Sequence, residues 1–150
     1  MARRKSGRAA AGGKWWDDGV RFACQGSGRC CVSRGAYGYV YLTLEDRRRL
    51  ARILGLPTAR FTRLYCARTD GLFHLRDEGP DCRFLEQNRC AVYEARPTQC
   101  RTWPFWPENM NARAWTAIAA YCPGVGKGRR VPRERIEAIL VEQRRSTAQL

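Results

Sequence analysis

The amino-acid sequence predicts a small, irregular α+β domain with short helices, a β-hairpin and little regular sheet, stapled by bound metal. Its 150 residues are enough for one domain with one modest hydrophobic core. Its periodic segments are short, and they alternate between helical and strand patterns. It also contains eight cysteines, and a small domain with a weak core gains folding energy from a metal that such residues bind.

The chain divides into three segments by composition. Residues 1–14 are basic and rich in Arg, Ala, Gly and Ser, and we expect a disordered tail because they cannot bury a core. Residues 15–128 contain every cysteine and are expected to form a cysteine-cluster metal-binding domain that begins at Trp15 and Trp16. Residues 129–150 are predicted to be a C-terminal helix and tail.

The first predicted elements are a strand and a helix. Residues 37–42 alternate and are rich in aromatic residues, which is typical of a strand. Thr43 is a good N-cap for the helix that follows, and the acidic residues of its first turn suit the helix dipole. Gly55 and Pro57 end this helix. Its expected buried stripe consists of Leu50, Ile53 and Leu54.

The middle of the chain predicts a helix, a strand and a hairpin. Residues 58–68 are expected to form the helix, and residues 72–75 the strand. Two short apolar runs separated by a polar turn predict a β-hairpin over residues 84–93. The buried face of the helix is expected to contain Phe61, Leu64 and Tyr65.

Three helical segments complete the prediction. Residues 96–100 are expected to form a helical turn with Pro97 in its first position, which places Cys100 near free backbone amides. Residues 111–121 and 132–146 are expected to be helices. Their inward-facing residues are expected to be Trp115 and Ile118 in the first, and Ile136, Ile139 and Leu140 in the second.

The formal net charge is +14, and arginine carries almost all of the positive charge. Much of it lies in the two terminal segments, as in solvated chain ends, so nucleic acid is a partner that we do not favour. Four arginines each lie next to a cysteine, and nearby guanidinium groups favour the thiolate form that binds metal. These are Arg29, Arg83, Arg89 and Arg101.

The chain is expected to be a cytoplasmic monomer. No apolar segment is long enough to cross a membrane, and residues 1–14 contain no apolar run typical of an export signal. Disulfides are an alternative use of the cysteines, but a reducing compartment disfavours them. A bridge between Cys30 and Cys31 would also be strained, because neighbouring Cα atoms lie only about 3.8 Å apart. Metal ligation is therefore the favoured interpretation.

The order of the cysteines is similar to that of a known family. The similarity is carried by residues 22–31, 81–85, 90–97, 99–107 and 122–124. They resemble the YkgJ-type cysteine-cluster family of CxxCxxCC zinc- or iron-chelating domains, over most of the chain between Trp15 and Gly128. The resemblance implies metal binding, including iron–sulfur cluster binding, through Cys24, Cys30, Cys31, Cys82, Cys90, Cys100 and Cys122.

One departure from the family pattern lies at Ser27, where the family has its second cysteine. Seven family-type cysteines remain, whereas two sites of four sulfurs each require eight. Either one site is open or lost, or Cys66, Ser27 or His74 completes it. An open coordination position is the arrangement that catalytic metals use.

Adjacent Cys30 and Cys31 are expected either to serve different centres or to divide into one ligand and one packing residue. This expectation assumes an extended chain, in which neighbouring side chains face opposite sides. The aromatic residues Trp103, Phe105 and Trp106 are expected to belong to the core or to shield the metal site from solvent.

Cys66 and His74 are expected to be ordinary structural residues. A free cysteine on a helix, as predicted for Cys66, is commonly a small buried hydrophobe. Strand alternation turns His74 away from its apolar neighbours, so we expect it at the surface.

The sequence therefore predicts a protein that binds zinc or iron, or an iron–sulfur cluster, through clustered thiolates. Cysteine ligands fit these cofactors equally well. Two alternatives remain open: an iron-dependent redox or protein-modifying enzyme with an open metal position, and a basic nucleic-acid module with a structural zinc. No catalytic residue can be named, because a chain with one histidine offers no Ser/His/Asp set.

Overall fold

The computed structural model describes residues 12–32 and 38–150, so most of the predicted basic tail lies outside the described residues. In chain order its elements are β1 (Val20–Phe22), η1 (Arg29–Cys31), α1 (Leu44–Ile53), α2 (Thr58–Tyr65), β2 (Cys66–Thr69), β3 (Leu72–Leu75), β4 (Leu85–Glu86), β5 (Arg89–Cys90), η2 (Tyr93–Ala95), α3 (Thr98–Thr102), η3 (Pro107–Asn109), α4 (Ala112–Ala119), β6 (Val125–Val131) and α5 (Arg133–Ala148).

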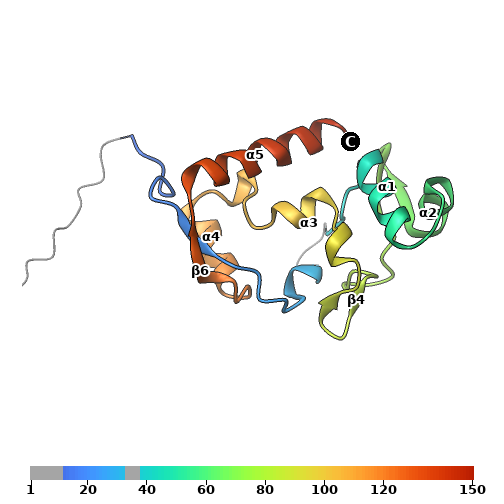
Figure 1. The fold of residues 1–150 in the computed structure, drawn as a ribbon, viewed down its shortest axis with the longest axis horizontal. Coiled ribbons are helices and arrows are strands. Elements are labelled where there is room, and N and C mark those ends of the chain that lie inside the picture. The colour runs from blue at the N-terminus through green and yellow to red at the C-terminus, as the bar shows by residue number, and fades with distance from the viewer. Residues whose placement is uncertain (1–11, 33–37) are drawn as a thin grey trace, which may run out of the picture.

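The predicted α+β class is confirmed. Within the described residues, five α-helices accompany three two-stranded antiparallel sheets: β1–β6, β2–β3 and β4–β5. Helices α1 and α2 lie at one end of the molecule, β6 and α4 at the other, and α3 between them, while α5 runs along one side (Figure 1). None of the helices in the described part of the chain is long and apolar enough to cross a membrane.

The first hydrophobic core lies at the end that contains α1 and α2. Helix α1 begins with a capping box in which Thr43 and Asp46 satisfy each other's backbone amides. The helix buries Leu50 and Ala51, whereas Ile53 of the predicted stripe is 46% exposed. The prediction was wrong at Ile53 because the buried face centres on the polar Asp46, which hydrophobic periodicity does not detect.

Helix α2 ends at Tyr65, three residues before its predicted end, because the chain turns into the hairpin of β2 and β3. The two strands are joined by Asp70 and Gly71, which both have positive φ. Asp-Gly between two short strands is a strong hairpin signal, so this boundary was detectable from the sequence. Phe61 is buried as predicted, but Leu64 is exposed.

His74 is buried, with 4% of its surface exposed, which corrects the expectation of a surface position. The segment before α1 covers the face of β3 that alternation assigned to solvent: Tyr41 forms an isolated β-bridge with His74, and the Tyr39 ring stacks on the imidazole at 4.0 Å. The imidazole is satisfied locally, with Thr69 Oγ1 2.9 Å from Nε2 and the Leu75 carbonyl oxygen 2.8 Å from Nδ1. The predicted strand over residues 37–42 is thus reduced to one bridge among its described residues.

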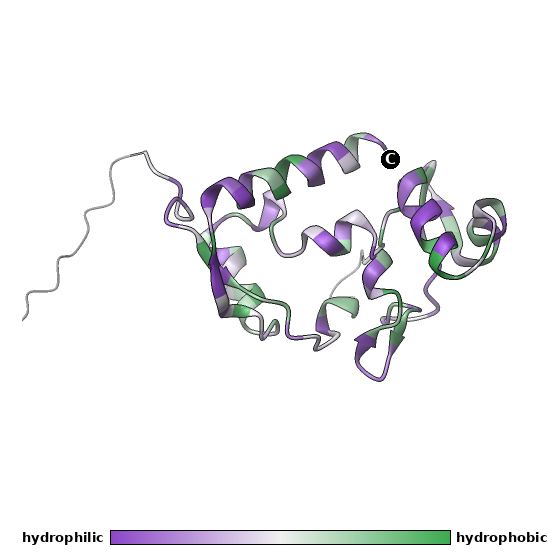
Figure 2. Cartoon of the chain, in the orientation of Figure 1, coloured by the Kyte–Doolittle hydropathy of each residue, from purple (hydrophilic) through white to green (hydrophobic). Residues whose placement is uncertain are grey.

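The second hydrophobic core lies at the opposite end. It contains Val20, Phe105, Ile136 and Leu140, so the predicted buried stripe of the C-terminal helix is confirmed. Hydrophobic and hydrophilic turns alternate along α5 (Figure 2). Strand β6 crosses residue 128, where the sequence predicted the end of the cysteine-cluster domain. It pairs with β1, and the sequence did not indicate this pairing.

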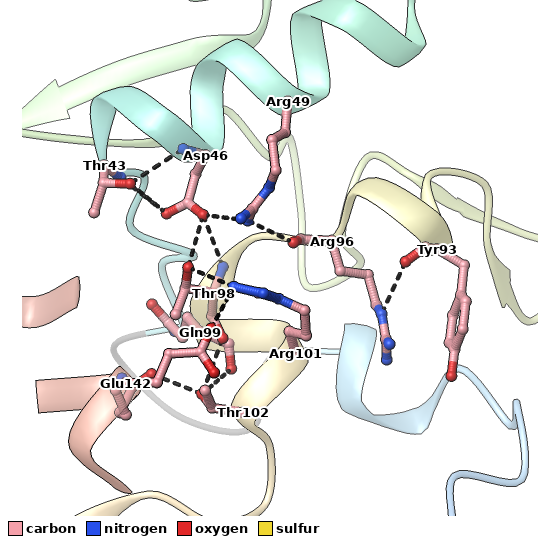
Figure 3. Close-up of polar contacts among 11 residues, drawn as sticks. Thr43, Asp46, Arg49, Tyr93, Arg96, Thr98, Gln99, Arg101, Thr102 and Glu142 are labelled. Carbon is pink, nitrogen blue, oxygen red and sulfur yellow. Dashed lines mark hydrogen bonds and ion pairs between the residues drawn. The ribbon is translucent and has the colours of Figure 1, made fainter. Parts of the chain in front are cut away.

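Helix α3 is connected by polar contacts to α1 and to α5 (Figure 3). The buried carboxylate of Asp46 on α1 accepts hydrogen bonds from the Thr98 amide at 2.9 Å and from its hydroxyl at 3.0 Å. At the other end of α3, Arg101 pairs with Glu142 at 2.7 Å. The Thr102 hydroxyl lies 2.7 Å from the Gln143 side-chain oxygen on α5. Five residues of helix are therefore held between α1 and α5.

We expect Asp46→Asn to lower the free energy of unfolding by about 3 kcal/mol, because it removes the charge that Arg49 pairs with at 2.7 Å inside the fold. Glu45→Gln is the matched control: Glu45 is the preceding residue, but its ion pair with Arg48 is exposed and 3.7 Å long. The control is expected to cost less than about 1 kcal/mol. Urea unfolding of both variants checks this, and equal effects would contradict a structural role for the buried carboxylate.

Candidate metal centre

A cavity of about 440 Å³ lies where the cysteine-bearing segments meet. Its walls come from the loop around η1, the β4–β5 hairpin, η2, α3 and Tyr121, two residues after α4. Six of the seven family-type cysteines line it: Cys24, Cys30, Cys31, Cys82, Cys90 and Cys100. All eight cysteines of the chain are described, and all are free thiols.

The first cysteine group is fixed against the second by backbone contacts. The amide of Cys82 donates to the carbonyl oxygen of Cys31 at 2.7 Å, and Val32 forms a β-bridge with Asp81. Gly28 has a φ of 68° and lies directly on the hairpin turn, where a Cβ would collide with the Asn88 carbonyl oxygen. Only glycine therefore lets the loop approach the hairpin this closely.

Cys30 and Cys31 share the cavity instead of facing opposite sides. They lie in the 3₁₀ turn η1, not in the extended chain that the prediction assumed, so their side chains do not alternate. The two thiols are hydrogen-bonded to each other, and Cys31 is also hydrogen-bonded to Cys90. The adjacent pair thus joins one group of sulfurs.

The thiols of this group differ in acidity. Hydrogen bonding from Cys31 lowers the pKa of Cys90 to about 6 and that of Cys30 to about 7. The same contacts raise the pKa of Cys31. Burial raises the pKa of Cys82 to about 11 and also raises the pKa of Cys100. Two sulfurs are thus prepared as thiolates near neutral pH, and the others retain their protons until a metal displaces them.

Backbone amides two residues further along the chain support three of the sulfurs. The Gly26 amide lies 3.4 Å from Cys24 Sγ. Backbone hydrogen bonds at Phe84 and Val92 lower the pKa values of Cys82 and Cys90, respectively. Amide hydrogen bonds to sulfur stabilise thiolates and tune the metals that they bind.

Arg96 supplies the positive charge that acts on the cavity sulfurs. It lowers the pKa values of Cys30, Cys90 and Cys100. Its guanidinium lies over the Tyr93 ring at 3.6 Å, and its Nε donates to the Tyr93 carbonyl oxygen at 2.9 Å (Figure 3). Arg96 was not predicted to act on the sulfurs, because it is not adjacent to a cysteine in the sequence.

The four arginines that lie next to a cysteine in the sequence divide into two that line the cavity and two that make contacts elsewhere. Arg29 and Arg89 line the cavity, whereas Arg101 pairs with Glu142. Arg83 lies over the Tyr65 ring at 4.4 Å and donates to two backbone carbonyl oxygens. Adjacency in the sequence therefore did not identify the charge that matters most at the sulfurs.

Cys24 and Cys122 lie close in sequence to β1 and β6, and they differ in one respect: Cys24 lines the cavity, whereas Cys122 does not. The Ala23 amide donates to the Gly124 carbonyl oxygen at 3.1 Å, which brings the segments that carry the two cysteines side by side. Cys122 is half-buried and is not among the lining residues of the cavity.

The residues considered as replacements for the eighth ligand do not line the cavity. Cys66 and His74 are buried in the β2–β3 hairpin, where Cys66 packs in the first core as predicted. Burial raises the pKa of the Cys66 thiol. Ser27 Oγ lies 3.4 Å from the Arg29 amide, and Ser27 is also absent from the cavity wall.

Aromatic side chains line the same cavity as the sulfurs. Trp103 and Trp106 are among them, with ring centroids 4.7 Å apart, whereas Phe105 between them belongs to the second core. The prediction of a core residue is thus confirmed for Phe105, and shielding of a metal by Trp103 and Trp106 stays a prediction. The aromatic residues that line the cavity are Tyr39, Phe84, Tyr93, Trp103, Trp106 and Tyr121.

The donor set suits a metal that prefers sulfur. Thiolates without histidine or a close carboxylate cluster are typical ligands of zinc and of iron–sulfur clusters. Within residues 12–32 and 38–150, no three Cys, His, Asp or Glu side chains form a preformed ligand set. The sulfurs therefore surround a shared space, and small side-chain movements would be needed to close them on a metal.

Comparison with known proteins agrees with this donor set. No solved structure matches the chain. A family model described as "CxxCxxCC: Putative zinc- or iron-chelating domain" matches residues 23–123, which include the whole cavity wall of cysteines. Because this match covers about two thirds of the sequence, the chain belongs to the CxxCxxCC family.

Proposed function

We propose that the protein binds zinc or iron through the thiolates of this cavity. The observation that carries the proposal is the convergence of six family-type cysteines, from segments up to 76 residues apart, on one space. Two of them have lowered pKa values, as metal ligands require. The family description supports metal chelation independently of the geometry.

The principal ligands are Cys30, Cys82, Cys90 and Cys100. All four line the cavity, and each of these sulfurs interacts electrostatically with at least two of the others, which supports their assignment to one centre. Cys31 is the alternative to Cys30, since its thiol contacts both Cys30 and Cys90. Cys24, in the cavity wall, and Cys122, on the neighbouring segment, are further donors available to a second metal or to an enlarged centre.

Among the family metals we favour iron, with an iron–sulfur cluster as the specific form. A cavity of about 440 Å³ is in the range of small-molecule sites and is larger than one ion bound by four sulfurs requires. Aromatic side chains line part of the cavity, and an apolar lining of this kind suits a cluster because it tunes the bound metal. Zinc is the alternative that the same sulfurs also fit.

Anaerobic purification followed by analysis of metal and acid-labile sulfide tests the proposal. We expect iron and sulfide in comparable amounts and a visible absorption spectrum from sulfur-to-iron charge transfer. Colourless protein that contains zinc would show that the cavity binds zinc and not a cluster. Protein that holds neither metal, and whose thiols titrate as disulfides, would exclude metal binding.

Cys100→Ala is expected to lose at least half of the bound metal, because Cys100 lies in the shared group of sulfurs. The matched control is Cys66→Ala, since Cys66 is also a buried thiol but packs in the first core away from the cavity. The control should retain the wild-type metal content and lose about 1 kcal/mol of stability. Elemental analysis of both variants decides, and equal metal loss would assign Cys66 a ligand role.

Metal affinity should rise with pH in a manner set by the thiol pKa values. Near pH 8, Cys30 and Cys90 have already lost their protons, whereas Cys82 and Cys100 still hold theirs. Binding then releases about two protons, and near pH 5 it releases about four. The logarithm of the zinc association constant should therefore increase by about two per pH unit near pH 8 and by about four near pH 5. Calorimetry in buffers of different ionisation enthalpy counts the protons, and four released near pH 8 would contradict the assigned acidities.

A further inference from the structure

Trp103 and Trp106 line the same cavity, but their indole nitrogens differ. The Trp106 N–H donates to the Gln99 carbonyl oxygen at 3.0 Å and to the Thr102 hydroxyl at 3.2 Å. The Trp103 N–H is buried, and it has no hydrogen-bond partner among the residues that the structure describes. A buried donor is costly to leave unsatisfied, so an unpaired donor in a binding site indicates a group that arrives with the ligand.

Trp103 lines the same cavity as a proposed metal ligand, Cys100. It follows α3 directly and lies three residues after Cys100 in the sequence. Two rings hold the indole in place: Trp106 lies edge-on at 4.7 Å, and Tyr121 is tilted at 6.3 Å. The unpaired N–H therefore belongs to a side chain that is held against the sulfur-lined space.

We propose that the Trp103 indole N–H donates a hydrogen bond to a sulfur of the bound metal centre. The inference rests on the proposed function, because the acceptor is either a cysteine thiolate on the metal or a bridging sulfide of a cluster. Both are electron-rich sulfurs, and a bound metal would fix them in the cavity. Trp103 is then a positioning residue that adds a side-chain donor to the backbone amides at Cys82 and Cys90.

Such a bond affects the metal centre in two ways. It draws electron density from the sulfur, so it favours the reduced form of an iron centre and raises its midpoint potential. It also stabilises the loaded protein relative to the metal-free protein, and loss of an outer partner of this kind lowers metal affinity about 10- to 100-fold. Neither effect is expected from a tryptophan that only fills space.

The experiment compares three variants of the full chain. Trp103→Phe removes the N–H and part of the ring. Replacing Trp103 by benzothienylalanine removes only the N–H, because sulfur takes its place in a ring of the same shape. Trp106→Phe is the matched control, since its N–H is already satisfied within the protein. Zinc affinity is measured by competition with a chromophoric chelator, the midpoint potential on anaerobically iron-loaded protein, and unfolding on metal-free protein.

We expect both Trp103 variants to bind metal about 10- to 100-fold more weakly, with a lower midpoint potential in the iron form and unchanged unfolding of the metal-free protein. Trp106→Phe should instead destabilise the metal-free protein. A loss of zinc affinity identifies a thiolate as the acceptor, whereas an effect confined to the iron form identifies a bridging sulfide.

Wild-type affinity and potential in the benzothienylalanine variant would overturn the inference and leave the proposed function intact. So would destabilisation of its metal-free form, because the N–H would then have a partner within the protein. If the metal-free chain has no unfolding transition, the affinity and potential of this variant decide. A wild-type protein that binds neither zinc nor iron overturns the proposed function and this inference together.

Discussion

The buried carboxylate of Asp46 is the interaction on which the rest of the structure depends. With 1% of its surface exposed, it is tolerated only because donors from two elements surround it: the amide and hydroxyl of Thr43, and the same two groups of Thr98. Arg49 provides the compensating charge and also donates to the Arg96 carbonyl oxygen at 3.1 Å. One carboxylate thus fixes the start of α3 against α1, and α3 carries Cys100 into the cavity.

The fold could be predicted where local patterns dominate, and not where packing overrides them. The stripe of α5 and the hairpin at Leu85–Cys90 followed from periodicity and turn chemistry. The positions of Ile53 and His74 could not be predicted in this way. Ile53 is exposed because the buried Asp46 shifts the buried face of α1, and His74 is buried because the segment before α1 covers β3. The pairing of β1 with β6 joins residues more than a hundred positions apart, for which a single sequence gives no local signal.

The cysteines that line the cavity could be singled out from the sequence for a chemical reason. Few side chains bind soft metals, so cysteine positions indicate candidate ligands even when the backbone path is unknown. The cysteine spacing could not predict the hydrogen bonds between the thiols or the pKa values of the thiols. Cys30 and Cys31 were expected either to serve different centres or to divide into one ligand and one packing residue. They lie in a turn, where the Cys31 thiol is hydrogen-bonded to both Cys30 and Cys90. Arg96 acts on three sulfurs from a position that sequence adjacency did not indicate.

The two hydrophobic cores explain why the cavity is placed where it is. Cys82 and Cys90 pack against the first core, while Phe105, five residues after Cys100, belongs to the second. Burial between the two cores disfavours the thiolate form, as at Cys100, whose pKa is raised first by burial and then by the neighbouring sulfurs. A bound cation stabilises thiolates and so reverses this preference. Metal binding would therefore link segments that pack against the first core to a segment that leads into the second.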